Sequence, residues 1–291
     1  MKDVEYFTPE TLDEAAALLL GLDSRTPPVA EGTDLIAQVT EGQRRLSMVL
    51  DLSRIPELNR LDYDERIGLR VGAAVPVPAL LEFPPVRRLY PMLADASVHT
   101  PPGATQGCAT LGGNLSPEAP SREMAPPLIC LRASAAIFGP HGWSELGVEA
   151  VFAGMSKTVL QPGEFVVDLR FPSPPPRSSG AYFRAVPRRK VESAVAGVGA
   201  FLAMEQDLVT CCGARLVLSG VFPAPMRALE AERFLAGKHL EGPVLSEAGA
   251  LAADRAGPIA GAARDRLELV RDLTCRALEE ALVRVRANAT T

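Results

Sequence analysis

Histidine and aromatic residues are scarce in this chain of 291 residues. There are three histidines, and phenylalanine, tyrosine and tryptophan together make up 5% of the sequence. The densest run of basic residues is only three long, Arg188-Arg189-Lys190. The formal net charge of the chain is −5. Because nucleic-acid binding needs a basic surface and often aromatic rings for stacking, we expect no nucleic-acid partner.

Long apolar runs and paired cysteines are missing as well. The first residues, Met1 to Glu5, are not followed by an apolar segment, and no apolar run reaches the length of about 18 residues that a membrane helix needs. The five cysteines are irregularly spaced and form no Cys-x-x-Cys pair, so neither a zinc site nor an iron–sulfur site is indicated. These absences predict a reduced, cytoplasmic protein without a membrane span or a metal site.

The common catalytic motifs are also absent. The sequence holds no Gly-x-Ser-x-Gly elbow, no His-Glu-x-x-His pair and no Gly-x-x-x-x-Gly-Lys loop. His99 borders a glycine-rich loop, where ligand contact is the minority interpretation, and His141 and His239 fall in an expected turn and an expected loop. Gly197-Val198-Gly199 lacks the third glycine of a dinucleotide-binding fingerprint, so we interpret it as a strand packed closely on its neighbour. We expect no catalytic residue in this chain.

Turn-forming residues are what the sequence has in excess. It contains 24 glycines and 26 prolines, yet 47% of its residues are apolar, which is typical of a folded protein with many turns. Thr11-Leu12-Asp13-Glu14 is a capping box that predicts a first helix up to Leu20. Apolar patterns predict further helices at 35–39, 128–131, 227–235 and 263–285, and strands at 48–52, 67–71, 135–138, 164–171, 195–204 and 214–221.

A proline-rich stretch divides the chain. Pro172 to Pro176 contains four prolines in five residues and is followed by Ser178-Ser179-Gly180, and such a segment continues neither a helix nor a strand. The chain is long enough for one large domain or two ordinary ones. We predict a first domain at 1–172, a linker at 173–180 and a second domain at 181–291.

Two glycine loops in the first predicted domain are candidates for ligand binding. Glu31-Gly32-Thr33-Asp34 joins a short apolar segment to a predicted helix, where backbone N–H groups favour an anion, although an ordinary helix cap explains the same residues equally well. Ala109 through Asn114 contains paired glycines, and such a surface of backbone donors suits a pyrophosphate or a flat ring. Tight turns use the same residues, but two such loops in one domain strengthen the binding interpretation.

These loops belong to longer segments that resemble a known family. The segments are AEGTDL at 30–35, ATLGGNL at 109–115, SREMAPPLICLRASAAIFGP at 121–140, LQPGEFVVDLRFP at 160–172 and AYFRAVPRRKVESAVAGVGAFL at 181–202. Together they resemble the FAD-binding medium subunit of the molybdenum hydroxylases, the family that includes xanthine dehydrogenase, carbon monoxide dehydrogenase and 4-hydroxybenzoyl-CoA reductase. The resemblance spans nearly the whole chain in the same order.

The resemblance implies a fold of the α+β class. The first domain would be a FAD-binding domain of the vanillyl-alcohol-oxidase/PCMH type with subdomains at about 1–55 and 56–172. The second domain would be smaller and would combine an antiparallel sheet with helices.

The resemblance also implies a FAD site. The first loop would hold the pyrophosphate on backbone amides, and the second would pass between the pyrophosphate and the isoalloxazine ring. Glu123 would bond the adenosine ribose, Val166 would line the flavin, and Thr100 falls where some members place an aromatic residue over the ring. The two loops consist of Val29, Ala30, Glu31, Gly32, Thr33 and Asp34, and of Thr110, Leu111, Gly112, Gly113 and Asn114.

Some positions depart from the family pattern. Glu31 stands where a glycine is usual, and Ala185, next to Arg184, replaces a lysine that usually reaches the flavin. Ala104-Thr105-Gln106 replaces a Gln-Ile-Arg stretch. No cysteine-rich insertion follows Gly113-Asn114-Leu115, so the extra four-iron cluster of one branch is expected to be absent.

The function implied is electron transfer. The molybdenum cofactor and two [2Fe–2S] clusters would belong to a large and a small partner subunit, in a dimer of heterotrimers, and FAD in this chain would exchange electrons with an external carrier. Two alternatives remain open: a structural medium subunit that has lost FAD, which Glu31 and Ala185 favour, and a stand-alone FAD oxidase, which the lack of a catalytic base disfavours.

Overall fold

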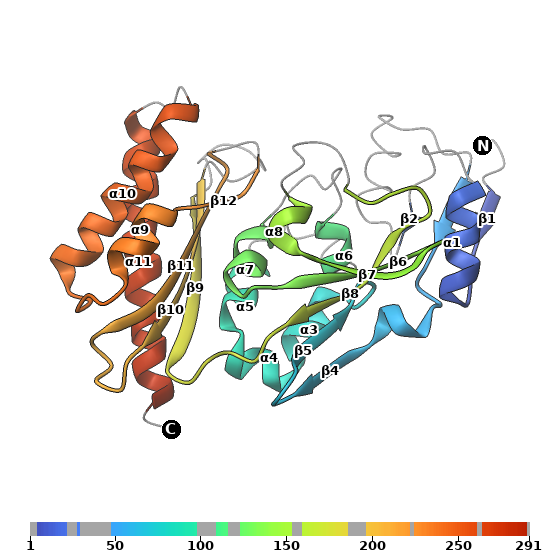
Figure 1. Cartoon of the computed structure of the whole chain (residues 1–291), viewed down its shortest axis with the longest axis horizontal. Coiled ribbons are helices and arrows are strands. Elements are labelled where there is room, and N and C mark those ends of the chain that lie inside the picture. The colour runs from blue at the N-terminus through green and yellow to red at the C-terminus, as the bar shows by residue number, and fades with distance from the viewer. Residues whose placement is uncertain are drawn as a thin grey trace. The chain divides into compact units, whose positions relative to one another are not determined.

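The computed structural model describes residues 5–21, 28–29, 48–97, 109–115, 123–152, 159–185, 196–221, 224–260 and 264–289 (Figure 1). The chain forms two compact units, and neither is continuous in sequence. The first unit comprises Met1–Phe83, Pro101–Pro120 and Ala133–Pro172, and the second comprises Pro84–Thr100, Ser121–Arg132 and Ser173–Thr291. Both combine helices with sheets, which confirms the predicted α+β class.

A small parallel sheet and the first helix begin the first unit. Strands β1 (Glu5–Phe7), β3 (Met48–Asp51) and β2 (Pro28–Val29) pair in the order β1-β3-β2. Helix α1 (Leu12–Gly21) starts at the predicted capping box, where Thr11 Oγ1 accepts from the Glu14 N–H at 3.2 Å and Glu14 Oε2 accepts from the Glu10 N–H at 3.0 Å. The predicted first helix is therefore confirmed.

The larger sheet of the first unit is antiparallel and has five strands in the order β4-β5-β8-β6-β7. The predicted turn at His141-Gly142 is confirmed, with Gly142 at φ +89°, but it leads into β7, which the sequence did not predict. The strands are β4 (Leu61–Asp64), β5 (Gly68–Gly72), β8 (Phe165–Phe171), β6 (Ser134–Gly139) and β7 (Gly142–Gly147). The short helices of this unit are η1 (Pro56–Asn59), α3 (Val77–Glu82), α6 (Leu111–Asn114) and α8 (Val148–Val151).

The core of the first unit joins both sheets. Phe165 and Val167 of β8 are buried in one cluster with Leu50 of β3 and with Ala15 and Ala16 of α1. Burial of this apolar surface stabilises the unit by the hydrophobic effect. The opposite face of β8 is polar and carries the ion pairs described below.

The second unit is built on a four-stranded antiparallel sheet in the order β12-β11-β10-β9. Alternate residues of β10, such as Val198 and Leu202, are buried in one cluster with residues of the three C-terminal helices. This confirms the predicted antiparallel sheet with helices. The elements are β9 (Ser178–Ala185), β10 (Ala196–Met204), β11 (Cys211–Ser219), β12 (Met226–Arg227), α9 (Leu229–Leu235), α10 (Gly242–Ala260) and α11 (Arg264–Ala289).

Helices from the predicted first domain cover the other face of this sheet. They are α4 (Pro84–Leu89), α5 (Pro91–Ser97) and α7 (Ala125–Cys130), of which α5 and α7 contact the strands. A Cβ atom at Gly199 would lie 3.1 Å from Cys130 Sγ, and one at Gly197 would lie 2.5 Å from the Tyr182 hydroxyl. The interpretation of Gly197-Val198-Gly199 as a closely packed strand is thus confirmed, whereas the domain boundaries stay a prediction.

Among the helices of the described segments, none is long and apolar enough to cross a bilayer.

Candidate functional site

The second predicted flavin loop forms a single helical turn, α6. Thr110 is its N-cap, and its Oγ1 accepts from the Gly113 N–H at 3.1 Å. The Thr110 carbonyl accepts from the backbone N–H of Asn114 at 3.2 Å and from Asn114 Nδ2 at 3.1 Å. Of the N–H groups at 111–114, only that of Leu111 has no partner among the described residues. The loop therefore offers fewer open donors than the glycine pair suggested.

Two backbone hydrogen bonds dock this loop on the segment that follows β5. The Val77 N–H donates to the Ala109 carbonyl at 2.8 Å, and the Gly112 N–H donates to the Ala73 carbonyl at 3.2 Å. Pro76 and Thr110 form an isolated bridge between the two segments. The position of α6 is thus set by β5 and its extension.

The two glycines of α6 have different environments. A Cβ atom at Gly112 would lie 2.6 Å from the Ala73 carbonyl oxygen, so close packing inside the unit requires this glycine. Gly113 is exposed, and among the described residues a Cβ there would meet only Thr110 Oγ1, at 3.4 Å, which is an ordinary contact. Nothing in the described part of the fold demands a glycine at position 113.

Val166 lies on β8, opposite Ile137 of β6, and is half-buried at the edge of the first-unit core. The pairing of β6 with β8 shifts here, because Ala136 pairs with Asp168 while Ile137 pairs with Val166. Val167 is therefore the extra residue of a β-bulge. Because a bulge bends its strand, it sets the direction of Val166.

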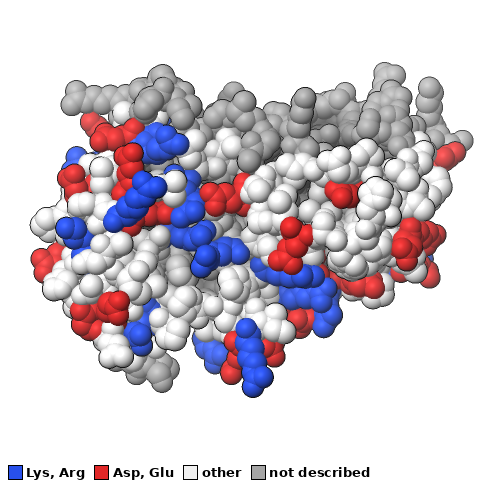
Figure 2. Space-filling view, in the orientation of Figure 1, with Lys and Arg blue, Asp and Glu red and all other residues white. Residues whose placement is uncertain are grey.

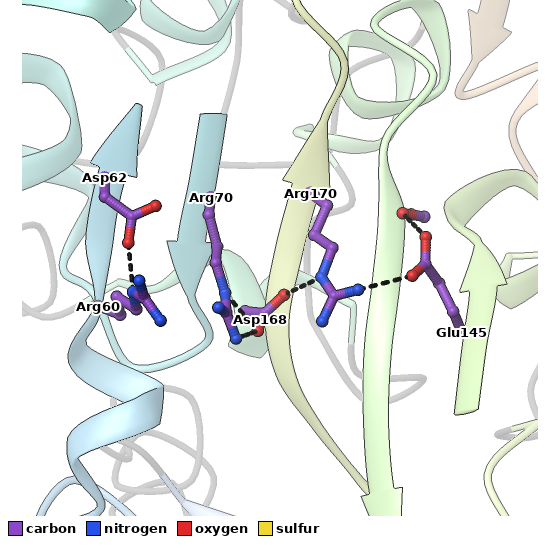
Figure 3. Close-up of polar contacts among 7 residues, drawn as sticks. Arg60, Asp62, Arg70, Glu145, Asp168 and Arg170 are labelled. Atoms are coloured by element: carbon purple, nitrogen blue, oxygen red, sulfur yellow. Dashed lines mark hydrogen bonds and ion pairs between the residues drawn. The ribbon is translucent and has the colours of Figure 1, made fainter. Parts of the chain in front are cut away.

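A chain of ion pairs crosses the polar face of the five-stranded sheet (Figure 3). Asp168 is fully buried, and its Oδ2 accepts from Arg70 Nε at 2.8 Å and from Arg70 Nη2 at 2.5 Å. Its Oδ1 accepts from Arg170 Nε at 2.9 Å, and Arg170 Nη1 pairs with Glu145 Oε2 at 2.7 Å. In the space-filling view, basic and acidic side chains lie beside one another over β5 and β8 (Figure 2). These charges neutralise each other and hold β5, β8 and β7 together.

Most of the first predicted flavin loop lies outside the described residues. Ala30, Glu31, Gly32, Thr33 and Asp34 are in this group, as are Thr100, His99 and the predicted helix at 35–39. Val29 is described through its backbone, which ends β2 beside Asp51 of β3. The first loop therefore follows the carboxyl end of a parallel strand, which is where ligands bind in parallel sheets.

Asp51 is a residue of this edge that the sequence analysis did not single out. Its Oδ2 accepts from the Tyr6 hydroxyl at 2.5 Å, and its Oδ1 accepts from the Ser53 N–H at 2.9 Å. Partial burial acts to raise the pKa of Asp51, but these hydrogen bonds outweigh it and lower the pKa. In the sequence, Asp51 lies near the end of the predicted strand at 48–52 and belongs to no recognised motif, so it did not stand out as a candidate.

Glu123 lies in the second unit, just before α7. Its Oε2 accepts from the Tyr182 hydroxyl at 2.8 Å, and its Oε1 pairs with Arg184 Nη1 at 2.6 Å. Burial, and then the charge of Glu123, raise the pKa of Tyr182 well above its usual value, so the hydroxyl stays protonated and donates. The carboxylate keeps further lone pairs for another donor. Ala185 packs on the helical core of this unit.

The described residues hold no cluster of three or more side chains suited to bind a metal ion, and His141 and His239 are exposed. The described candidate residues supply backbone amides and the apolar side chain of Val166, together with the polar side chains of Thr110, Asn114 and Glu123.

Comparisons with known proteins define the family. Residues 2–174 match the model of the FAD binding domain in molybdopterin dehydrogenase, and residues 181–281 match the model of the CO dehydrogenase flavoprotein C-terminal domain. The first model covers more than half of the chain, so the chain belongs to this family of flavoprotein subunits. The resemblance stated from the sequence is confirmed.

Individual relatives match along most of the chain. A carbon monoxide dehydrogenase medium chain from Afipia carboxidovorans is 27% identical and covers 97% of this chain and 98% of its own. A putative xanthine dehydrogenase FAD-binding subunit from Escherichia coli is 27% identical, covering 78% and 77%. A chain in the crystal structure of the cyanide-inactivated Cu,Mo-CO dehydrogenase has a TM-score of 0.85 at 26% identity, covering 97% and 98%.

Proposed function

We propose that this chain binds FAD and is the electron-transfer subunit of a multi-subunit molybdenum hydroxylase. The observation that carries the proposal is Gly113, which is exposed and has no side chain although the fold has room for one. The Leu111 N–H, which has no partner within the described residues, is a donor for a phosphate oxygen beside it. FAD, when bound, supplies the redox chemistry, and the protein binds and orients it.

The residues implied by the family resemblance are proposed as the site. Thr110 to Asn114 would face the cofactor through α6, and the segment from Val29 to Asp34 would hold the pyrophosphate at the carboxyl end of β2. Val166 would give an apolar contact to the flavin, with Thr100 at the ring. Glu123 would accept a hydrogen bond from a ribose hydroxyl, using the lone pairs that Tyr182 and Arg184 leave open.

The names of the relatives support the proposed partners. Medium chains of carbon monoxide dehydrogenase match nearly all of this chain. We infer a large subunit with the molybdenum cofactor, a small subunit with [2Fe–2S] clusters, assembly as a dimer of heterotrimers, and an external electron carrier in the cytoplasm. The substrate would be bound by the large subunit.

Two glycine substitutions test the proposal. Gly113→Ala has room inside the protein and keeps a helical backbone, so we expect unchanged stability together with a loss of FAD, measured as flavin absorbance after acid release. Gly112→Ala is the matched control, because its methyl group clashes with Ala73 and lowers stability as well. Full FAD content in Gly113→Ala, or no flavin in the native complex, contradicts the proposal.

A structural medium subunit without FAD is the second candidate. It is favoured by the internal use of the Gly112, Gly113 and Asn114 amides, and by Glu31 in the first loop. Glu31→Gly separates the two candidates. A rise in flavin content from none to one per chain identifies the native chain as a scaffold, while full occupancy before and after the change rejects the scaffold.

A further inference from the structure

The end of β5 and the residues after it are fixed by three backbone hydrogen bonds to two other segments of the first unit, residues 58–60 and strand β8. The Gly72 N–H donates to the Arg60 carbonyl at 2.6 Å, the Ala73 N–H to the Val167 carbonyl at 2.8 Å, and the Ala74 N–H to the Leu58 carbonyl at 2.9 Å. A Cβ at Gly72 would lie 2.1 Å from the Leu58 carbonyl oxygen, so the backbones are in close contact. This segment has little freedom to move.

Ala73 connects the β8 bulge to α6. On one side its N–H bonds the carbonyl of Val167, the extra residue of the bulge. On the other side its carbonyl accepts the Gly112 N–H at 3.2 Å. Its methyl group also faces Gly112, because a Cβ built there would lie 2.7 Å from the Ala73 Cβ. One small residue therefore separates the sheet from the glycine pair.

The ion pairs of Asp168 support this connection from the opposite face of β8. Asp168 is the neighbour of Val167 and pairs in register with Gly72, the neighbour of Ala73. Arg70 and Arg170 hold its carboxylate from two sides (Figure 3). The contact between β5 and the bulge is thus stabilised by the ion pairs of Asp168 on one face and by the hydrogen bond from the Ala73 N–H to the Val167 carbonyl on the other.

We propose that Ala73 is a positioning residue for the cofactor site, because its carbonyl and methyl group set the distance at which Gly112 and Gly113 stand from the sheet. The inference rests on the proposed FAD function. A larger side chain at position 73 pushes α6 outward, since Gly112 has no side chain to give way and even a Cβ atom built there would lie 2.7 Å from the Ala73 Cβ. Ala73 acts through Gly112, which its carbonyl and methyl group face.

Ala73→Val in the full chain tests the proposal, with Ala74→Val as matched control. Both alanines are buried in the same core cluster, but the Ala74 N–H donates to the Leu58 carbonyl, whereas the Ala73 carbonyl and methyl group face Gly112 of α6. We expect both variants to lose similar thermal stability. Only Ala73→Val is expected to weaken FAD binding, by about tenfold in a fluorescence titration, and to shift the visible spectrum of the bound flavin.

A second measurement does not need FAD. In the apo chain, we expect hydrogen exchange of the Gly112 and Asn114 amides to be faster in Ala73→Val and unchanged in Ala74→Val. The Gly112 N–H donates to the Ala73 carbonyl and the Asn114 N–H to the Thr110 carbonyl, so both amides report a displacement of α6. If Ala73→Val does not fold, Ala73→Ser applies the same test with a smaller group. Equal FAD affinity and equal exchange in the two variants overturn the proposal. Absence of FAD from the native chain overturns the proposed function, while the exchange comparison still decides the role of Ala73.

Discussion

At the scale of the residue, Asp168 shows how a buried charge is tolerated. Its carboxylate has no exposed surface and is shared by two arginines. In contrast, Arg60, just before β4, and Asp62 of β4 form an exposed pair, with side chains 56% and 44% exposed. Removing one partner of a buried pair leaves charge without compensation, while an exposed pair contributes little.

We therefore predict that Asp168→Asn lowers the free energy of unfolding by about 3 kcal/mol, the lower end of the range for breaking a buried pair, since both arginines keep some solvent contact. Asp62→Asn is the control and should cost less than about 1 kcal/mol. Urea unfolding of the full chain measures both values. Similar losses in the two variants would show that burial of Asp168 does not determine its contribution.

A second prediction at this scale concerns Cys211. Burial raises the pKa of its thiol to about 11, whereas Cys212, next in sequence, is exposed. The folded pKa lies above the unfolded value, so the stability that comes from the neutral thiol is complete below about pH 9 and is lost as pH rises towards 11.

The measurement is the free energy of unfolding between pH 8 and 11. We expect Cys211→Ala to remove part of the alkaline loss of stability and Cys212→Ala to leave it unchanged. In the native chain, iodoacetamide should modify Cys212 well before Cys211, because the thiolate is the reactive form. Modification of both at the same rate at pH 8 would contradict the buried position of Cys211.

The sequence predicted the glycine pair of the site but not the difference between its members. Gly112 is explained by Ala73, a residue far earlier in the chain, and Gly113 has no such partner. This difference depends on a tertiary contact, and no local pattern encodes it. The partners of Glu123 could not be predicted from the sequence for the same reason, since Tyr182 and Arg184 lie on β9, far from Glu123 in the chain.

At the scale of the element, β9 is an edge strand whose backbone is satisfied by side chains. The Tyr182 N–H donates to Asp95 Oδ2 at 3.0 Å, and the Gly180 carbonyl accepts from Arg284 Nη1 at 2.9 Å. Asp95 of α5 and Arg284 of α11 also pair with each other at 2.7 Å. The ion pair takes the place of a neighbouring strand and blocks the edge against further pairing.

We predict that Asp95→Ala and Arg284→Ala each cost about 1.5–3 kcal/mol, the range for hydrogen bonds to charged groups, and that a double-mutant cycle gives a coupling of about 1 kcal/mol or more. Hydrogen exchange at the Tyr182 amide should speed up in Asp95→Ala. Additive losses, or an unchanged Tyr182 amide, would show that the pair does not protect the strand.

Elements were predicted where their signals are local and missed where a proline or glycine suggested a break. Helix α1 begins at its Thr11–Glu14 capping sequence, and β10 and β11 are long strands rich in apolar residues. Helices α4 and α5 were missed because they begin at prolines, which fit the first turn of a helix and need not end one. Helix α7 begins three residues before the predicted helix at 128–131, and Pro126 lies in its first turn. Helix α10 was not predicted, since it contains Gly249 and Gly257-Pro258, which are typical of breaks. The order of the strands rests on long-range pairing.

At the scale of the whole molecule, the chain passes five times between its two compact units. The sequence indicated one boundary at the proline-rich segment, yet 84–100 and 121–132 belong to the unit that contains the C-terminal sheet. Those segments supply Asp95, Glu123 and the apolar residues Met92 and Leu93, which are fully buried. A proline-rich composition indicates a break between elements, but it does not indicate which helices from earlier in the chain pack on a sheet formed later in it.

The fragment 173–291 is therefore predicted not to fold on its own. It retains all strands of the four-stranded sheet but lacks α5 and α7, so the face of β10 around Gly199 and the backbone of β9 lose their cover. We expect helical far-UV circular dichroism, strong binding of an apolar dye and poorly dispersed amide resonances, as in a molten globule.

Co-expression of 1–172 with 173–291 is the matched control, because it returns the missing helices without the covalent link. Cooperative unfolding and dispersed resonances are expected for the pair and not for the fragment. If the fragment alone unfolds cooperatively with dispersed resonances, the proline-rich segment marks an independent domain, as the sequence predicted. In that case α5 and α7 would be accessory, and the Asp95–Arg284 pair would contribute little to the stability of the sheet.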